Sequence, residues 1–297
     1  MALLTAQGIS QVAIALLNRA LVLPRTVTAI PGAEFAGANG DTITVRVPQP
    51  GAARTQASAG AALTADDIDE IPVDVTLAHL YHLKNISDQE ASLELEDFAR
   101  QITRVQVAAV ALGAEDELAG AMNALVADGT IEFAAVATEA DTAATILAAR
   151  EFLIENGAPP SELFAAVSPQ IATRILSITN LTKVSEAGSA SALRDAIIGR
   201  YFGFTFVESA ALDDDTSLFY HRSGFCFANR VPVRPRGATD SSSADADGIG
   251  LRQVFQYNAG TASDQSLVST FAGAAAVWED GASASDNQRF VKVGVGS

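Results

Sequence analysis

Hydrophobic and polar residues alternate in two stretches near the start of the chain, residues 42–47 and 71–77. Alternation with a period of two predicts β-strands with one apolar face. The intervening residues 48–67 are rich in Gly, Ala, Ser and Thr and have no periodicity, which predicts a loop. We expect the second strand to continue through residue 86, so that both strands form an extended hairpin over about residues 40–86. Because a lone hairpin is marginally stable in water, its apolar face needs a partner surface.

Two further stretches have the three- and four-residue spacing of helices. The first covers residues 5–20 and ends at Leu23-Pro24, because the residue before a proline disfavours the helical conformation. The second begins at Leu95 and runs for about 30 residues, far beyond the usual ~11–12, which is typical of an architectural axis. This long helix is expected to bury one stripe, formed by Phe98, Ile102, Val105, Ala109, Leu112, Ala119, Met122 and Val126.

Two shorter helices are expected in the middle of the chain. The first is capped by Asp141 or Thr142 and stopped by Gly157 and Pro159, and the second starts at Pro169. Strand-like runs precede and follow these helices: residues 130–138, 200–209, 216–233, 251–258, 266–278 and 289–295. The mixture places the chain in the α+β class.

The composition of the 297-residue chain, 48% hydrophobic and 18% charged, is that of a globular protein. This length allows one large domain or two of ordinary size. No apolar run approaches the ~20 residues that a membrane-spanning helix needs, so we expect no membrane segment. Residues 1–8 contain no Lys or Arg, so we expect no secretory signal peptide and a cytoplasmic origin.

The net charge of −16 argues against a tight nucleic-acid binder, because such proteins present a basic face. The densest basic stretch, RVPVRPR, holds only Arg230, Arg234 and Arg236 and reads as a turn-rich segment. A chain this acidic remains compatible with a place beside nucleic acid that it does not bind specifically.

Motifs for catalysis or cofactor binding are absent or incomplete. There is no GxxxxGK[ST] or GxSxG pattern, and Gly248 and Gly250 do not form a dinucleotide fingerprint. His79 and His82 are three residues apart on an expected strand, so they point to opposite faces, and no Cys or acidic residue nearby completes a metal site. His221 has no serine motif to act with. These observations favour ordinary structural histidines.

The acidic clusters and the single cysteine also have structural explanations. Residues 245–248 lie in a Ser- and Asp-rich stretch, 237–250, that predicts a polar loop, and a calcium loop fails because the required Glu is missing. Three aspartates at 213–215 suit a turn, and acids at 94–97 suit the first turn of the long helix. Cys226 in an apolar run is expected to be buried. We predict no enzyme activity, no cofactor and no metal.

The order of elements carries a resemblance to a known family. The stretches that match are ALVLPRTV and GDTITVRVP, then VDVTLAHLYHLKNISDQEASLELEDFARQI, and last GRYFGFTFVES and FYHRSGFCFANRVPV. In this order they resemble the major capsid proteins of tailed phages with the Hong Kong 97-type fold, and are most similar to the short capsid proteins of actinobacterial siphophages. The match covers most of the chain.

The resemblance implies an α+β fold whose extended loop lies over a neighbouring subunit, and whose axial domain meets its copies around the five- and six-fold axes. The hairpin then packs on the next subunit. The implied parts are residues 1–37 as N-terminal arm, 38–86 as extended loop, 87–157 as peripheral domain with the spine helix, 158–227 as axial domain, and 228–297 as C-terminal return strands of the peripheral domain.

The resemblance also implies a structural protein of the virion that self-assembles into the icosahedral shell around a double-stranded DNA genome. Its partners are then copies of itself in pentamers and hexamers, with a portal and a separate scaffolding protein during assembly in the host bacterial cytoplasm. A separate scaffold is expected because the rising strand begins near Thr42, which leaves no room for a scaffolding segment. DNA is enclosed without sequence-specific binding, and no membrane takes part.

Contacts between subunits are expected from charged residues of the arm and the hairpin: Arg25, Arg46, Arg54, Asp66, Asp67, Asp69 and Glu70. Some family members cross-link their subunits through a lysine of the extended loop, but here the first lysine is Lys84, at the base of that loop. An encapsulin-like nanocompartment shell shares the fold and is the main alternative. A soluble enzyme or binding protein with an unrecognised site is the third.

Overall fold

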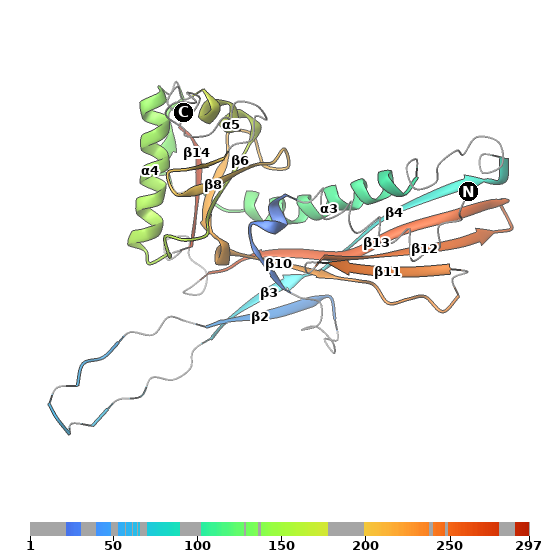
Figure 1. The fold of residues 1–297 in the computed structure, drawn as a ribbon, viewed down its shortest axis with the longest axis horizontal. Coiled ribbons are helices and arrows are strands. Elements are labelled where there is room, and N and C mark those ends of the chain that lie inside the picture. Colours follow the sequence, from blue (N-terminus) through green and yellow to red (C-terminus); the bar gives the residue numbers. More distant parts are fainter. Residues whose placement is uncertain are drawn as a thin grey trace.

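The molecule has a long lobe, a smaller lobe at one end of it, and a hairpin that extends away from both (Figure 1). Within the described residues, each lobe contains a six-stranded β-sheet. The residues described by this computed structural model are 22–30, 40–48, 53–56, 58–60, 62–63, 65, 70–89, 102–127, 129–135, 138–177, 199–237, 240–246, 249–278 and 289–296.

The sheet of the long lobe is centred on β13 (Ser263–Ala276). Strand β4 (Ala78–Ser87) pairs with one side of β13, and β12 (Ile249–Asn258) and β10 (Phe225–Arg230) pair in turn along its other side, all antiparallel. Strand β11 (Asp240–Ala246) adds to the far side of β12. The register of β4 on β13 runs from Ser87 opposite Ser263 to Ala78 opposite Ala272, so the second half of the predicted hairpin belongs to this sheet.

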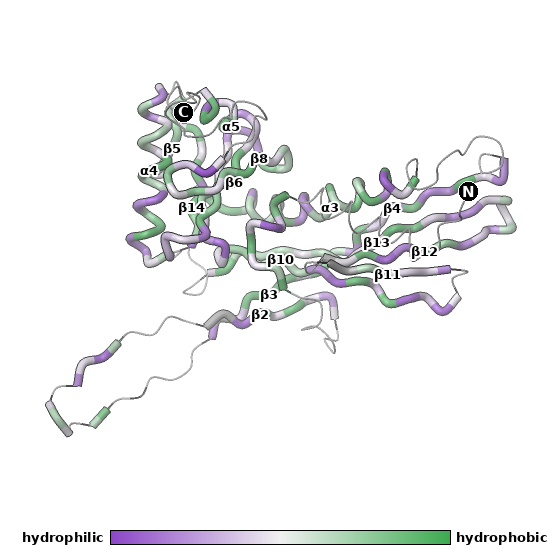
Figure 2. The backbone as a smooth tube through the Cα atoms, viewed as in Figure 1, coloured by the Kyte–Doolittle hydropathy of each residue, from purple (hydrophilic) through white to green (hydrophobic). Residues whose placement is uncertain are grey.

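Helix α3 (Arg104–Asn123) lies along one face of this sheet (Figure 1). Its 20 residues are fewer than the predicted 30 or so, and the predicted first turns, residues 95–101, lie outside the described residues. Apolar residues predominate along the helix (Figure 2). The residues that it buries are Gln106, Val107, Val110, Ala111, Ala114, Glu115, Leu118, Ala119 and Met122.

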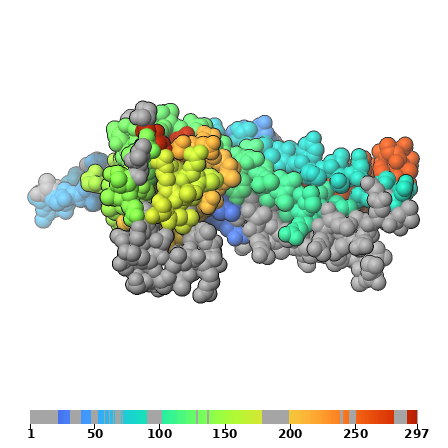
Figure 3. All heavy atoms as spheres, turned by 90° about the horizontal axis from the view of Figure 1, so that it is seen from above, coloured from blue at the N-terminus to red at the C-terminus, as the bar shows by residue number. Residues whose placement is uncertain are grey.

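The buried stripe predicted for this helix is wrong at Val105, Leu112 and Val126, whose side chains are 56%, 65% and 77% exposed. The predicted stripe followed three- and four-residue steps, but the buried face is displaced around the helix and runs through Val107, Val110 and Leu118. Ala119 and Met122 are buried as predicted. Ile102 is buried as expected, and Phe98 lies outside the described residues. Seen from above, the outer face of α3 is part of the surface of the long lobe (Figure 3).

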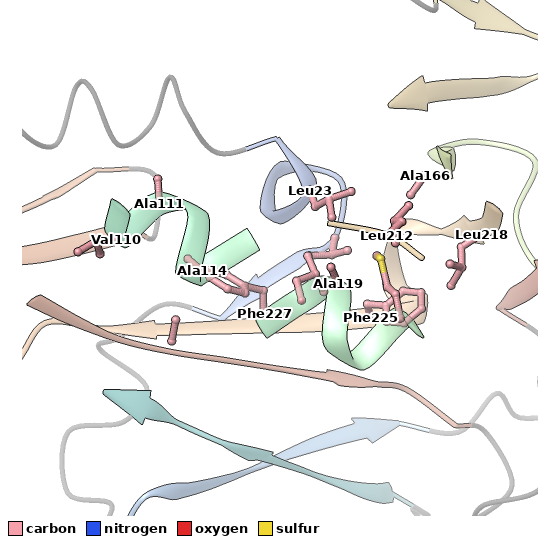
Figure 4. Packing of buried hydrophobic residues seen from close by; sticks show 14 of the residues in the cluster. Leu23, Val110, Ala111, Ala114, Ala119, Ala166, Leu212, Leu218, Phe225 and Phe227 are labelled. Atoms are coloured by element: carbon pink, nitrogen blue, oxygen red, sulfur yellow. The ribbon is translucent and has the colours of Figure 1, made fainter. Parts of the chain in front are cut away.

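One apolar core joins the two lobes (Figure 4). Leu118 of α3 is fully buried in the same cluster as Phe225 and Phe227 of the long-lobe sheet and Tyr220 of the small lobe. The rings of Tyr220 and Phe225 meet edge to face, with their centroids 5.2 Å apart. Because side chains of both lobes fill one cluster, the cluster fixes the orientation of the lobes to each other.

The sheet of the small lobe is covered by two helices, α4 (Glu139–Glu155) and α5 (Pro169–Leu176). Phe204 and Phe219 pack edge to face at its centre, with their centroids 5.0 Å apart. In spatial order its strands are β5 (Glu132–Phe133), β14 (Phe290–Val295), β9 (Ser217–His221), β6 (Leu163–Val167), β8 (Phe204–Glu208) and β7 (Arg200–Tyr201).

The start of α4 differs from the prediction. The N-cap is Thr138, whose hydroxyl accepts a hydrogen bond from the backbone N–H of Asp141 at 3.2 Å, while the Asp141 carboxylate accepts one from the Thr138 N–H at 2.9 Å. Asp141 and Thr142 therefore lie inside the first turn, and this reciprocal pair is a capping box. At the other end Gly157 has φ 89°, a conformation that suits glycine and ends the helix as predicted.

Strand pairing groups the elements differently from the domain boundaries that the resemblance implied. Strands β5 and β14 and helix α4 pack in the small lobe, with Phe133, Ile146 and Val291 in one cluster. The implied boundaries put residues 87–157 and 228–297 in the other domain. The boundaries followed chain order, whereas long-range pairing returns the last strand to the small lobe.

The Ser- and Asp-rich stretch that predicted a loop instead forms β11, which pairs antiparallel with β12 from Asp240 opposite Phe255 to Ala246 opposite Ile249. Among the described strands, β11 has a single neighbour. Polar residues are typical of such edge strands because they discourage pairing with further chains. Composition alone therefore concealed a strand whose polarity suits its place at the edge.

The hairpin consists of β2 (Thr42–Pro48) and β3 (Glu70–Thr76), paired from Thr42 opposite Thr76 to Pro48 opposite Glu70. It is shorter than predicted, because the chain leaves it at Thr76 and enters β4. The described residues beyond its strands, 53–56, 58–60, 62–63 and 65, are all exposed. In Figure 1 this distal part lies well away from both lobes.

The base of the hairpin packs on its own chain, which corrects the expectation that its apolar face packs only on a neighbour. Ile43, Val73 and Val75 are buried in one cluster with Cys226 and Val277. The chain also crosses β13 closely here: a Cβ added at Gly273 would lie 2.2 Å from the Thr76 carbonyl oxygen. Glycine is therefore required at position 273, and this contact and the cluster fix the direction in which the hairpin leaves the body.

Candidate assembly interface

The exposed side of the hairpin carries paired charges. The Arg46 Nη1 atom lies 3.3 Å from Glu70 Oε2, and Thr44 Oγ1 donates a hydrogen bond to Asp74 Oδ1 at 2.6 Å. Because the side chains of Arg46 and Glu70 are 75% and 38% exposed, their attraction is largely screened by water. Two residues that were predicted to contact a neighbouring subunit thus pair within one hairpin.

The other predicted contact residues lie in different parts of the molecule. Arg25 is the exposed last residue of the 3₁₀ turn η1 (Leu23–Arg25), and Arg54 is exposed in the distal part of the hairpin. Three predicted aspartates lie outside the described residues: Asp66, Asp67 and Asp69. Within the described part of the chain the structure brings together Arg46 and Glu70 alone from this set. A role for the set between subunits stays a prediction.

A buried carboxylate that the sequence analysis missed anchors the start of the described chain to α3. Glu115 is 7% exposed and accepts backbone hydrogen bonds from Val22 and from Leu23, the latter at 3.0 Å to Oε1 and 3.2 Å to Oε2. Leu23 is itself fully buried. Strand β1 (Thr28–Ile30) follows and pairs in parallel with β10. A Glu inside a helical run gave no sequence signal for this contact.

The surroundings of Glu115 raise the pKa of its carboxyl group, because burial disfavours the charge more strongly than the two backbone donors favour it. The neighbouring Asp116 raises the pKa further. The phenol of the buried Tyr220, hydrogen-bonded to Thr26, is held neutral nearby, since burial raises its pKa as well. The folded chain therefore keeps the Glu115 proton to a higher pH than the unfolded chain does.

We expect the stability of the subunit to reflect this carboxyl group. With a raised pKa in the folded state, its contribution is fully present below the ordinary pKa of 4.5 and is lost as the pH rises through the raised pKa. Glu115→Gln should raise the melting temperature at neutral pH, and the difference from the wild type should shrink towards pH ~4. Melting curves across this pH range measure the effect.

The matched control for that experiment is Glu115→Ala, which removes the acceptor as well as the charge. It should lose about 1–3 kcal/mol at every pH, because the N–H groups of Val22 and Leu23 are left without a partner. A Gln variant that melts below the wild type at neutral pH would show that the structure favours the charged carboxylate instead.

The serine and histidine that lie close together form a turn and not a catalytic pair. His221 Nδ1 lies 2.8 Å from Ser223 Oγ and also accepts the Ser223 backbone N–H at 3.2 Å. Arg289 Nη1 donates to the same hydroxyl at 3.2 Å. These bonds cap the short turn η4 (Arg222–Gly224), where a turn was predicted. Burial lowers the pKa of His221.

The remaining chemical candidates are structural within the described residues. Cys226 is buried, as predicted, and burial raises the pKa of its thiol to about 11, which makes it a poor nucleophile. His79 and His82 both lie on β4, where their spacing places them on opposite faces of the sheet. No group of three metal-ligating side chains occurs in the part of the chain that the structure describes. None of the described helices is long and apolar enough to span a membrane.

Solved structures with the same architecture include a phage capsid and an encapsulin. A protein of Mycobacterium phage Che8 is 17% identical and has a TM-score of 0.62, with 92% of this chain and 90% of that chain covered. The capsid of cyanophage P-SCSP1u is 13% identical and has a TM-score of 0.59, with 92% of this chain and 86% of that chain covered. The holo-SrpI encapsulin complex of Synechococcus elongatus PCC 7942 is 15% identical and has a TM-score of 0.52, with 92% of this chain and 86% of that chain covered. These similarities define the fold as the Hong Kong 97 type, which confirms the predicted fold class.

Residues 96–270, more than half of the chain, match the family described as phage capsid protein, and the chain belongs to this family. It is therefore a structural major capsid protein, a component of the virion, as the resemblance implied. No curated protein sequence matches the chain.

Proposed function

We propose that this capsid protein forms a closed icosahedral shell of pentamers and hexamers that encloses a double-stranded DNA genome. Assembly takes place in the cytoplasm of the host bacterium, with a separate scaffolding protein and a portal. The DNA is enclosed without sequence-specific binding, in keeping with the net charge of −16.

The position of the hairpin supports this proposal most strongly. Its base is fixed to the body by the cluster around Val75 and by the close crossing at Gly273, while its described distal residues are all exposed. An element that is anchored so firmly and extends beyond the body is suited to contact a second copy. A repeated contact between unlike surfaces of identical chains forms a ring where the rotation between copies closes, and such rings are the units of the proposed shell.

The parts of the chain have distinct roles in this proposal. The arm, residues 1–37, and the hairpin of the extended loop connect subunits, and the hairpin lies over a neighbour. Strand β4, at the end of the implied loop 38–86, belongs to the long-lobe sheet. The long lobe is the peripheral domain with α3 as its spine helix. The small lobe is the axial domain, whose copies surround the five- and six-fold axes.

Particles purified from phage-producing cells test the function. We expect a closed shell that contains this chain and protects double-stranded DNA from added nuclease. The likeness to the SrpI encapsulin complex makes a nanocompartment the second candidate. Closed shells that carry protein cargo and no genome support that second candidate and contradict the virion.

We also expect the shell to be held together without covalent links. No lysine precedes Lys84, which lies on β4 in the long-lobe sheet, and Lys292 donates a hydrogen bond to the Asn123 carbonyl at the end of α3 at 2.7 Å. Arg54 in the loop does not replace a lysine, because a guanidinium group is not a nucleophile in proteins. Mature particles boiled in detergent should therefore run as single chains on a gel. A ladder of covalent oligomers contradicts this expectation.

A further inference from the structure

The segment between β10 and β11, residues 231–237, presents a basic surface on an acidic molecule. Val233 is 80% exposed, and Arg234 and Arg236 are exposed beside it. Within the described part of the chain, neither arginine takes part in an ion pair, although the chain has a net charge of −16.

The backbone of this segment is held in place, so its side chains are presented in a defined arrangement. Pro232 is buried and Pro235 is half-buried, and each proline fixes its own φ angle. Arg252 Nη1 of β12 donates to the Val233 carbonyl at 2.5 Å, and Arg252 Nη2 donates to Ser269 Oγ at 3.1 Å. A surface that is ordered before binding loses little conformational entropy when a partner docks.

The chain itself contains a segment of complementary chemistry. The return side of the hairpin reads Leu63-Thr-Ala-Asp-Asp-Ile-Asp-Glu70, with four acids in its last five positions, of which Glu70 pairs with Arg46 of its own hairpin. Leu63 is 80% exposed, so the segment also offers an apolar side chain, as Val233 does beside the arginines. The arginine segment and the hairpin therefore match in both charge and apolar contact.

The two segments lie at opposite ends of one molecule, so we expect them to meet between two copies. In Figure 1 the hairpin extends to the lower left, whereas the chain from β10 into β11 runs along the opposite, right-hand end of the long lobe. The base of the hairpin, held by Val75 and Gly273, directs the hairpin away from the arginine segment of its own chain. A contact that joins opposite ends of two copies is heterologous, the type that forms a ring where the rotation between copies closes.

We propose that residues 231–237, with Arg234 and Arg236 as charged partners, form the docking surface for the acidic hairpin segment 63–70 of a second copy. This inference rests on the proposed shell function and assigns the receiving surface of the hairpin. Nucleic acid is the less suitable partner, because two arginines on so acidic a chain do not make a basic face.

Charge reversal tests the assignment. The variant Arg234→Glu/Arg236→Glu should lower the yield of assembled particles by roughly tenfold or more, because like charges then face each other at every contact. The matched control is Arg104→Glu/Arg200→Glu, which makes the same change in charge at two exposed arginines outside the segment and should assemble normally. Both variants should melt like the wild-type subunit, and Arg234→Ser/Arg236→Ser repeats the test without adding charge.

Restoring assembly by reversing the charges of both segments is the sharper test. Asp66→Arg/Asp67→Arg alone should also impair assembly, and combining it with Arg234→Glu/Arg236→Glu should restore particles. Wild-type yields from the arginine variants, or no restoration in the combination, overturn the assignment. Normal shells that package less DNA overturn it as well and assign the arginines to nucleic acid. If the wild-type chain never assembles, the proposed shell function itself is wrong. This result differs from one in which only the arginine variants disagree with the assignment.

Discussion

Deleting residues 50–65 should leave a folded subunit that no longer forms stable shells. The described residues within this stretch are all exposed, so none of them contributes to a core of the body. The hairpin base stays attached through Ile43, Val73 and Val75. In the proposed shell the deletion removes the part that contacts a second copy, and this loss is repeated at every such contact. Thermal melting monitors the fold of the subunit, and electron microscopy with sedimentation monitors assembly.

A linker of Gly and Ser with the same number of residues is the control for this deletion. It keeps the length of the loop and removes its side chains, so it should impair assembly as the deletion does. Stable shells of normal size from the deletion variant contradict a role of the loop between subunits. A deletion variant that fails to melt cooperatively shows instead that the loop supports the fold of its own chain.

The second large effect concerns the buried face of α3. Leu118→Asp should destabilise the subunit by several kcal/mol, because it places a charge in the core that both lobes share and leaves a cavity there. Leu112→Asp on the opposite side of the same helix is the matched control. The Leu112 side chain is 65% exposed, whereas that of Leu118 is fully buried. Chemical denaturation of both variants measures the difference.

Equal losses of stability in the two variants contradict the assigned faces of α3. The Leu112 variant should keep the melting temperature of the wild-type subunit. A loss of stability confined to Leu112→Asp reverses the assignment and supports the stripe that helical spacing predicted.

Much of the fold can be predicted from the sequence where hydrophobic residues recur with a regular period. Alternation gave the strands of the hairpin, and Pro169 and Gly157 marked the ends of helices where the structure has them. Periodicity failed where tertiary packing decides. The buried face of α3 follows Val107, Val110 and Leu118, whereas the predicted stripe placed Val105 and Leu112 on that face although both are exposed.

The candidate interface was harder to predict, because it depends on which distant segments meet. Arg46 and Glu70 were both named from the sequence, but their ion pair within one hairpin follows from strand register. The anchor at Glu115 was missed, since its partners are backbone N–H groups that carry no sequence signal. The polar stretch of β11 was predicted as a loop but forms a strand. Its pairing with β12 at the edge of the sheet decides its structure, and its composition does not reveal this.

Electron microscopy of the purified protein shows whether copies of this chain build a closed shell. With the phage scaffolding protein present, we expect closed shells of pentamers and hexamers in which the β2–β3 hairpin of each subunit lies over a neighbour. Protein that remains monomeric at high concentration with scaffolding protein present contradicts the claim.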